Sequence, residues 1–136
     1  MAKLLWALAC QRVITDQESN SVSYIDAVEQ LSVPKLPFQF PPFTVATLWK
    51  REKRGEKINM RLGVFGPDDK TIVDFEPEPG ESETALRHRM NLTLGGLPIT
   101  AAGQHRIEVQ QKVKGKWRTE GELQIDVTQV TRPAES

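Results

Sequence analysis

Apolar and polar residues alternate along five segments of the chain, and this spacing predicts β-strands rather than helices. Successive side chains of a strand point to opposite faces, so each alternating row indicates one packed face and one solvated face. Burial on one face only is typical of antiparallel sheets. The alternating rows cover residues 43–49, 58–64, 86–94, 105–113 and 123–127.

Short turn sequences separate these rows. Residues 16–20 divide the first predicted strand from the second, and residues 53–56 and 114–116 are interpreted as hairpin turns. Pro67 and Asp68 suit the two central positions of a type I turn. Because turns recur at short intervals without a helical pattern between them, the sequence predicts an all-β, two-sheet antiparallel sandwich of about eight strands.

The first apolar segment, residues 4–10, does not alternate, which predicts a strand buried on both faces. Such a strand is central in its sheet, or its outer face is covered by another segment or another subunit. The same run also fits a helix. The β-branched residues of the continuation, Val13 to Thr15, favour the strand.

Two segments interrupt the strand pattern. Residues 34–42 carry four prolines, which lack the N–H that a sheet requires, so we expect an extended crossing between the two sheets. Residues 76–83 form an acidic loop. We expect a single domain over residues 1–130, followed by a mobile C-terminal tail at residues 131–136, which lacks apolar anchors.

The charge balance and the cysteine content exclude several classes of protein. With 18 basic and 18 acidic residues, the chain lacks the basic excess of a non-specific nucleic-acid binder. Cys10 is the only cysteine, so no intrachain disulfide forms. The apolar stretch before Cys10 is shorter than a secretory leader, and no run approaches the length of a membrane span. These features predict a soluble, cytoplasmic protein.

The residues that could carry chemistry do not form a catalytic set, and we expect no enzyme, no cofactor and no metal. His88 and His105 both fall in apolar rows, where a hydrogen-bonded core histidine is the more common role. Cys10 lies in an apolar strand, and burial there would raise its pKa and make it unreactive. The carboxylates of residues 68–83 lack a calcium-loop spacing and are interpreted as a solvated loop.

Basic and aromatic residues supply the candidate interaction surface. Two predicted turns are basic, with a tryptophan beside each, and could meet an anionic partner if they share one end of the sandwich. The alternative is that lysine-rich tips only keep strand edges soluble. The aromatic residues near the prolines either form a docking surface or plug their own core. The candidate residues are Trp6, Phe38, Phe40, Trp49, Arg51, Arg54, Lys114, Lys116 and Trp117.

The order of the segments 22–28, 62–68 and 102–109 around the proline-rich crossing resembles a family of small, uncharacterised bacterial proteins. The resemblance extends over nearly the whole chain, and the motifs that carry it are strands and turns. It implies an immunoglobulin-like β-sandwich in a bacterial cytoplasm. It implies no activity and no catalytic residues.

These observations predict a non-enzymatic interaction or structural module that binds a protein, either a second copy or a different chain. The alternative is a sandwich that binds a small ligand or a carbohydrate through exposed Trp49 and Trp117. An enzyme that uses His88 and His105 is a third hypothesis, and it requires the two side chains to lie within reach of each other.

Overall fold

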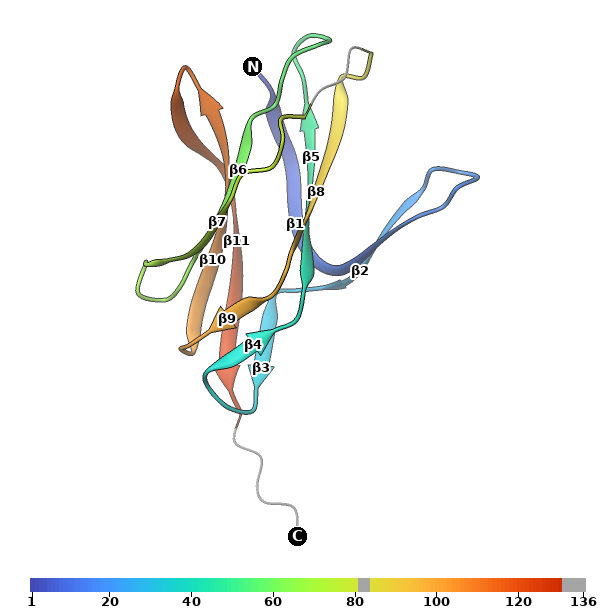
Figure 1. The fold of residues 1–136 in the computed structure, drawn as a ribbon. Helices are drawn as coiled ribbons and strands as arrows, with labels where there is room; N and C mark the ends of the chain where they lie inside the picture. Colours follow the sequence, from blue (N-terminus) through green and yellow to red (C-terminus); the bar gives the residue numbers. More distant parts are fainter. Residues whose placement is uncertain (81–83, 131–136) are drawn as a thin grey trace.

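The computed structural model describes residues 1–80 and 84–130, which form eleven β-strands and, within these ranges, no helix (Figure 1). The expected mobile tail at 131–136 lies outside the described residues. The strands are β1 (Lys3–Thr15), β2 (Val22–Ala27), β3 (Gln30–Val33), β4 (Phe38–Phe40), β5 (Phe43–Lys50), β6 (Met60–Phe65), β7 (Thr71–Phe75), β8 (Arg87–Leu94), β9 (Leu97–Ile99), β10 (Gly103–Val113) and β11 (Lys116–Gln129).

The strands form two main sheets, as the sequence predicts. Sheet A has the order β2-β1-β5-β8, and sheet B has the order β3-β11-β10-β6-β7. All neighbouring strands are antiparallel except β3 and β11, which run parallel. The strand count exceeds the expected number of about eight because β3, β4 and β9 are short pieces of three or four residues that carry little periodicity.

The core lies between the two sheets and is filled by the alternating rows. In β6, for example, Met60, Leu62 and Val64 all point into the core and are essentially inaccessible. The first apolar segment is a strand, which rules out the helix alternative, and β1 is an interior strand of sheet A. Fully burying each large apolar side chain contributes on the order of 1.5–3 kcal/mol, so these rows stabilise the sandwich.

One polar residue occupies the inward row of β10. Gln111 lies on the same face as Val109, is 3% exposed, and its side chain donates a hydrogen bond to the carbonyl of Ala2. The next residue of this row, Val113, is only half-buried because it lies at the hairpin turn, beyond the β10 residues that pair with β6. The pairing of β10 with β11 shifts after Val109, and the extra residue of this β-bulge is Glu120 on β11, so the faces of β10 are unchanged.

The segment at residues 53–56 is not a hairpin turn, contrary to the sequence prediction. It connects β5 of sheet A to β6 of sheet B, and residues 51–59 therefore cross between the sheets. Arg51 lies at the start of this connection and is 1% exposed. The hairpin predicted at residues 114–116 is present between β10 and β11, and the turn predicted at Pro67 and Asp68 joins the antiparallel strands β6 and β7. A local turn signal gives a change of direction but does not say which sheet the next strand joins.

The second half of β1 leaves the sandwich. Lys3 to Cys10 pair with β5, whereas Cys10 to Thr15 pair with β2 on the opposite side. The two strands and their turn project as a hairpin away from the two sheets (Figure 1). We call residues 11–26 the β1–β2 arm.

The proline-rich segment has a short pairing that the sequence does not predict. β4 pairs with β9 in a small two-stranded ribbon next to the sandwich (Figure 1). The rings of Phe40 and Phe43 meet edge to face at 5.3 Å between centroids, and both are buried. This segment therefore closes the end of its own core.

Candidate interaction surface

The outward face of sheet A combines apolar side chains with charged side chains that have no ion pair among the described residues. The pairing of β1 with β5 and of β5 with β8 aligns the outward residues of the three strands in rows. Residues paired across strands share a face, so each row crosses the sheet. From the Met1 end the rows are Lys3–Lys50–Arg87, Trp6–Leu48–Arg89, Leu8–Ala46–Asn91 and Cys10–Thr44–Thr93.

Apolar residues occupy the middle of this face over β1 and β5. Ala46 and Leu48 are buried although they point away from the core, and Trp6 and Leu8 are half-buried. Trp6 meets Tyr24 of the β1–β2 arm edge to face, with 5.2 Å between the ring centroids. Edge-to-face aromatic pairs contribute roughly 0.5–1.5 kcal/mol beyond their area, so this contact holds the base of the arm against the face.

The end of the face nearest Met1 is basic. Lys3, Lys50 and Arg87 stand directly opposite one another on three neighbouring strands. Within the described part of the chain, no ion pair neutralises any of the three or the adjacent Arg89. Like charges directly opposite each other destabilise a sheet. This row is therefore a site where an anionic group would be bound favourably.

The two acids of the β5–β6 connection do not neutralise this row. Glu52 and Glu56 both bond to the amino group of Met1, at 2.5 and 2.8 Å. Burial tends to raise the pKa of Glu56, but the bonds from the Met1 amino group and from the Glu52 amide outweigh it and hold that pKa below its usual value. The Glu56 carboxylate is therefore ionised, and its partner is the Met1 amino group rather than a residue of the basic row.

The outward face of sheet B differs, because its arginines have partners within the same chain. The guanidinium of Arg61 stacks on Trp117 at 4.5 Å from the ring centroid and donates a hydrogen bond to Gln110 at 2.8 Å. Arg106 stacks on Phe65 and forms ion pairs with acidic neighbours. Stacked and bonded arginines of this kind have less to gain from an added anionic partner than arginines without such contacts.

Two residues proposed for the interaction surface are instead structural. Trp49 is fully buried, and its indole N–H donates to the hydroxyl of Thr47 at 3.0 Å. Arg51 is buried and donates to the carbonyls of Glu56, Gly80 and Ala85 at 2.7–3.1 Å. The prediction that these two residues belong to an interaction surface is wrong. Trp49 points inward from β5, and the path of the β5–β6 connection encloses Arg51.

The other proposed residues are divided between the core and the surface. Phe40 is buried and Phe38 half-buried, so the plug is the correct interpretation for Phe40. Arg54, Lys114 and Lys116 are exposed, and their two loops lie at the same end of the sandwich (Figure 1). Trp117 at the second loop is half-buried, and the cation stacked on it already covers its ring.

The two histidines do not form a catalytic pair. His88 lies on β8 of sheet A, where it pairs with Trp49 of β5, whereas His105 lies on β10 of sheet B, where it pairs with Ile125 of β11. Burial lowers the pKa of His88, and the positive charge of Arg51 lowers it further. His105 is buried, and its Nδ1 lies 3.2 Å from the carbonyl oxygen of Gly103. The hypothesis of an enzyme with this pair is therefore not supported.

Other candidate chemistry is also weak. Burial raises the pKa of the Cys10 thiol, which keeps it protonated. Among residues 1–80 and 84–130, no three histidine, cysteine or acidic side chains come together as a metal site would require. Glu81 and Glu83 of the acidic loop lie outside these ranges. Within them, no helix has the length and apolar character that crossing a bilayer demands.

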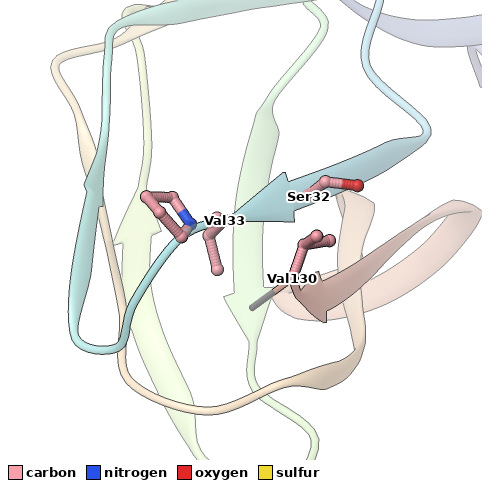
Figure 2. A pocket seen from close by; sticks show the side chains of 4 residues that line it. Ser32, Val33 and Val130 are labelled. Carbon is pink, nitrogen blue, oxygen red and sulfur yellow. The ribbon is translucent and has the colours of Figure 1, made fainter. Parts of the chain in front are cut away.

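A separate hollow of about 420 Å³ lies where β3 and β11 end. Val33 and Val130 lie close together at this hollow (Figure 2), and Ser32 is also part of its lining. Pro34 completes the lining, so the site offers one hydroxyl and no charge. A lining with one hydroxyl and otherwise apolar side chains does not indicate which ligand would bind.

Sequence reasoning counted Lys50 among the residues of a basic turn but missed the row that it forms on the outward face of sheet A. Lys3, Lys50 and Arg87 lie far apart in the sequence, and only the strand order and pairing bring them together. The sequence does not indicate that Tyr24 belongs to this face, because the chain has to turn back in the arm before the Tyr24 ring can meet Trp6. Trp6 is the proposed residue that the structure places on this face.

Comparison with known proteins gives a family. A family of unknown function (DUF6941) matches residues 5–126, which confirms the resemblance to uncharacterised proteins. The chain is similar to the crystal structure of an immunoglobulin-like protein from Pseudomonas aeruginosa, with 16% identity and a TM-score of 0.43. This similarity covers 94% of this chain and 97% of that one. No curated protein matches the chain.

Proposed function

Because the chain belongs to DUF6941, a family of unknown function, we propose a role for it from its own surface. We propose that it is a non-enzymatic protein-interaction module that docks through the outward face of sheet A and the β1–β2 arm. The observation that carries this proposal is the row Lys3–Lys50–Arg87, unpaired within the described chain and bordered by the apolar block around Trp6.

The composition of this face fits a protein partner. Specific interfaces have an apolar centre surrounded by polar residues, and tryptophan and arginine provide much of their binding energy. Trp6 and Arg89 lie in one row on either side of the buried Leu48, so an aromatic and a cationic group are close together on this face. The outward face of sheet B has its arginines already stacked and bonded, and for that reason it is the less favourable side.

A small-ligand or carbohydrate site receives no comparable support. That alternative needs an exposed tryptophan ring, whereas Trp49 is buried and Trp117 is covered by Arg61. We place the module in a bacterial cytoplasm. The support for this location is the resemblance given by the sequence, together with a lone cysteine that cannot form an intrachain disulfide.

Site-specific photo-crosslinking in the protein's own cells tests the proposal. A photoreactive residue replaces Asn91, which is exposed on the outward face of sheet A. The matched control carries the same residue at Gln124, exposed on the outward face of sheet B. We expect a protein adduct, identified by mass spectrometry, from position 91 and none from position 124. The substitution Trp6→Ser should reduce the adduct several-fold.

Three results would contradict the proposal. One is the absence of any protein adduct at position 91, and another is equal adduct formation at both positions. The third is an adduct that survives Trp6→Ser unchanged, because the apolar block would then not take part in docking.

A further inference from the structure

We propose that the partner on this face is a second copy of the same chain, with the β1–β2 arm of each copy lying on the outward face of sheet A of the other. This inference rests on the proposed function, because it names the occupant of the same surface. The charges of the arm, its exposed side chains and its length support it.

The arm carries the charge that the face lacks. Its turn, residues 16–21, contains Asp16 and Glu18 and no basic residue. Bonds from the Glu18 amide and the Ser19 hydroxyl lower the pKa of Asp16, so this carboxylate is ionised at neutral pH. The face offers four cations, Lys3, Lys50, Arg87 and Arg89, that have no ion pair among the described residues. An acidic tip and a basic row are complementary.

A chain cannot satisfy this complementarity by itself. The tip of the arm points away from the two sheets (Figure 1), and neither acid forms an ion pair with a described cation. The base of the arm is held in place by the contact of Trp6 with Tyr24. A second copy, however, can bring its own tip to the row.

The arm also supplies an apolar group for the apolar block. Ile14, close to the tip, is 47% exposed, which is high for a large aliphatic side chain. From Cys10 to Thr15 the arm extends by about 17 Å at ~3.3 Å per residue, and the turn adds to this. The face from Cys10 to Lys3 measures about 23 Å on the same basis. When the arm of a second copy has its base at the Cys10 end of this face, the arm is therefore long enough to reach toward the basic end of the face.

Twofold symmetry doubles the contact. In an isologous dimer the same two patches meet twice, arm on face and face on arm. Every favourable charge contact then occurs in two copies. This symmetry also provides a strict test, because each copy contributes one acidic and one basic patch.

Two charge-reversal variants test the pairing. In the arm variant, Gln17→Lys and Glu18→Lys make the tip positive and retain Asp16, whose carboxylate accepts the Glu18 amide. In the face variant, Lys50→Glu, Arg87→Glu and Arg89→Glu make the row acidic. All five side chains are exposed, so the fold should be unaffected, and urea unfolding midpoints equal to that of the wild type verify this.

Sedimentation equilibrium measures the oligomeric state of the full chain. We expect a wild-type dimer whose Kd rises with salt, and for each variant alone a Kd at least about tenfold higher, because like charges then meet. An equimolar mixture of the variants should form a heterodimer, since each arm again faces an opposite charge.

A wild-type chain that stays monomeric up to about 100 μM, far above the μM affinities of weak specific complexes, overturns the inference. Variants that dimerise as the wild type does, or a mixture that stays monomeric, also overturn it. If position 91 then crosslinks to a different protein, the interaction function stands and only self-association is wrong. If position 91 crosslinks to nothing, both proposals are wrong.

Discussion

Arg51 should be one of the most sensitive positions for stability although it belongs to a run of basic residues. Its guanidinium is buried and donates hydrogen bonds to the carbonyls of Glu56, Gly80 and Ala85. These bonds connect the β5–β6 connection to the segment between β7 and β8. Replacing Arg51 with Met keeps the aliphatic stem and removes every donor.

The magnitude follows from the bonds lost. A hydrogen bond from a charged group contributes about 1.5–3 kcal/mol, and a buried carbonyl left without a partner costs about 1–3 kcal/mol. The carbonyl of Gly80 keeps a second bond from the amide of Ile58, so the full sum does not apply. We expect Arg51→Met to lower the free energy of unfolding by about 3 kcal/mol, near the lower end of the cost of breaking a buried charged network.

Urea unfolding followed by tryptophan fluorescence measures this change, because Trp49 becomes exposed only when the core opens. With a slope of about 1.5 kcal/mol/M, the midpoint should fall by about 2 M. Arg54→Met is the matched control, since Arg54 is exposed on the same connection and should change stability by less than about 0.5 kcal/mol. A loss below about 1 kcal/mol for Arg51→Met, or equal losses for the two variants, would refute the reasoning.

Two further predictions concern His88 and Tyr24. Burial and then the charge of Arg51 lower the pKa of His88, so the unfolded chain binds the proton first as pH falls. The free energy of unfolding should therefore drop as the pH falls below about 6.5. In urea titrations between pH 7.5 and 5.5, His88→Gln should lose less stability than the wild type. Equal losses for the two proteins would exclude this role of His88. The hydroxyl of Tyr24 is buried without a hydrogen-bond partner among the described residues, so Tyr24→Phe should be neutral or stabilise by up to about 1 kcal/mol in thermal unfolding. A clear destabilisation would mean that the hydroxyl is bonded.

The local pattern of the sequence determined the strands and their inward faces. A period of two forces alternate residues to one side, so the row Ile58, Met60, Leu62 and Val64 could be assigned without knowing any partner strand. The turn between β10 and β11 was equally local, because Lys114 and Gly115 both adopt positive φ there. For both features, the forces that decide the structure act within a few residues.

Long-range pairing decided what the local pattern could not. Alternation placed Trp49 on an apolar row, but only the closed core shows that its ring is sealed inside. The same charge pattern covers Arg51 and Arg54, yet one is buried because carbonyls from two distant segments surround its guanidinium. Gln111 lies on the inward row of β10, and only the tertiary structure brings the carbonyl of Ala2 to its side chain.

The candidate site depends most on the tertiary structure. The sequence marked Trp6 as an aromatic residue in an unusually apolar strand, and that much is a property of the segment itself. The row Lys3–Lys50–Arg87 exists only because β5 lies between β1 and β8 in this register. Strand order is set by the burial of the whole chain rather than by any one segment, and a sliding register would move each charge to another neighbour. The sequence therefore determined which residues form strands, and the fold determined which of their charges meet.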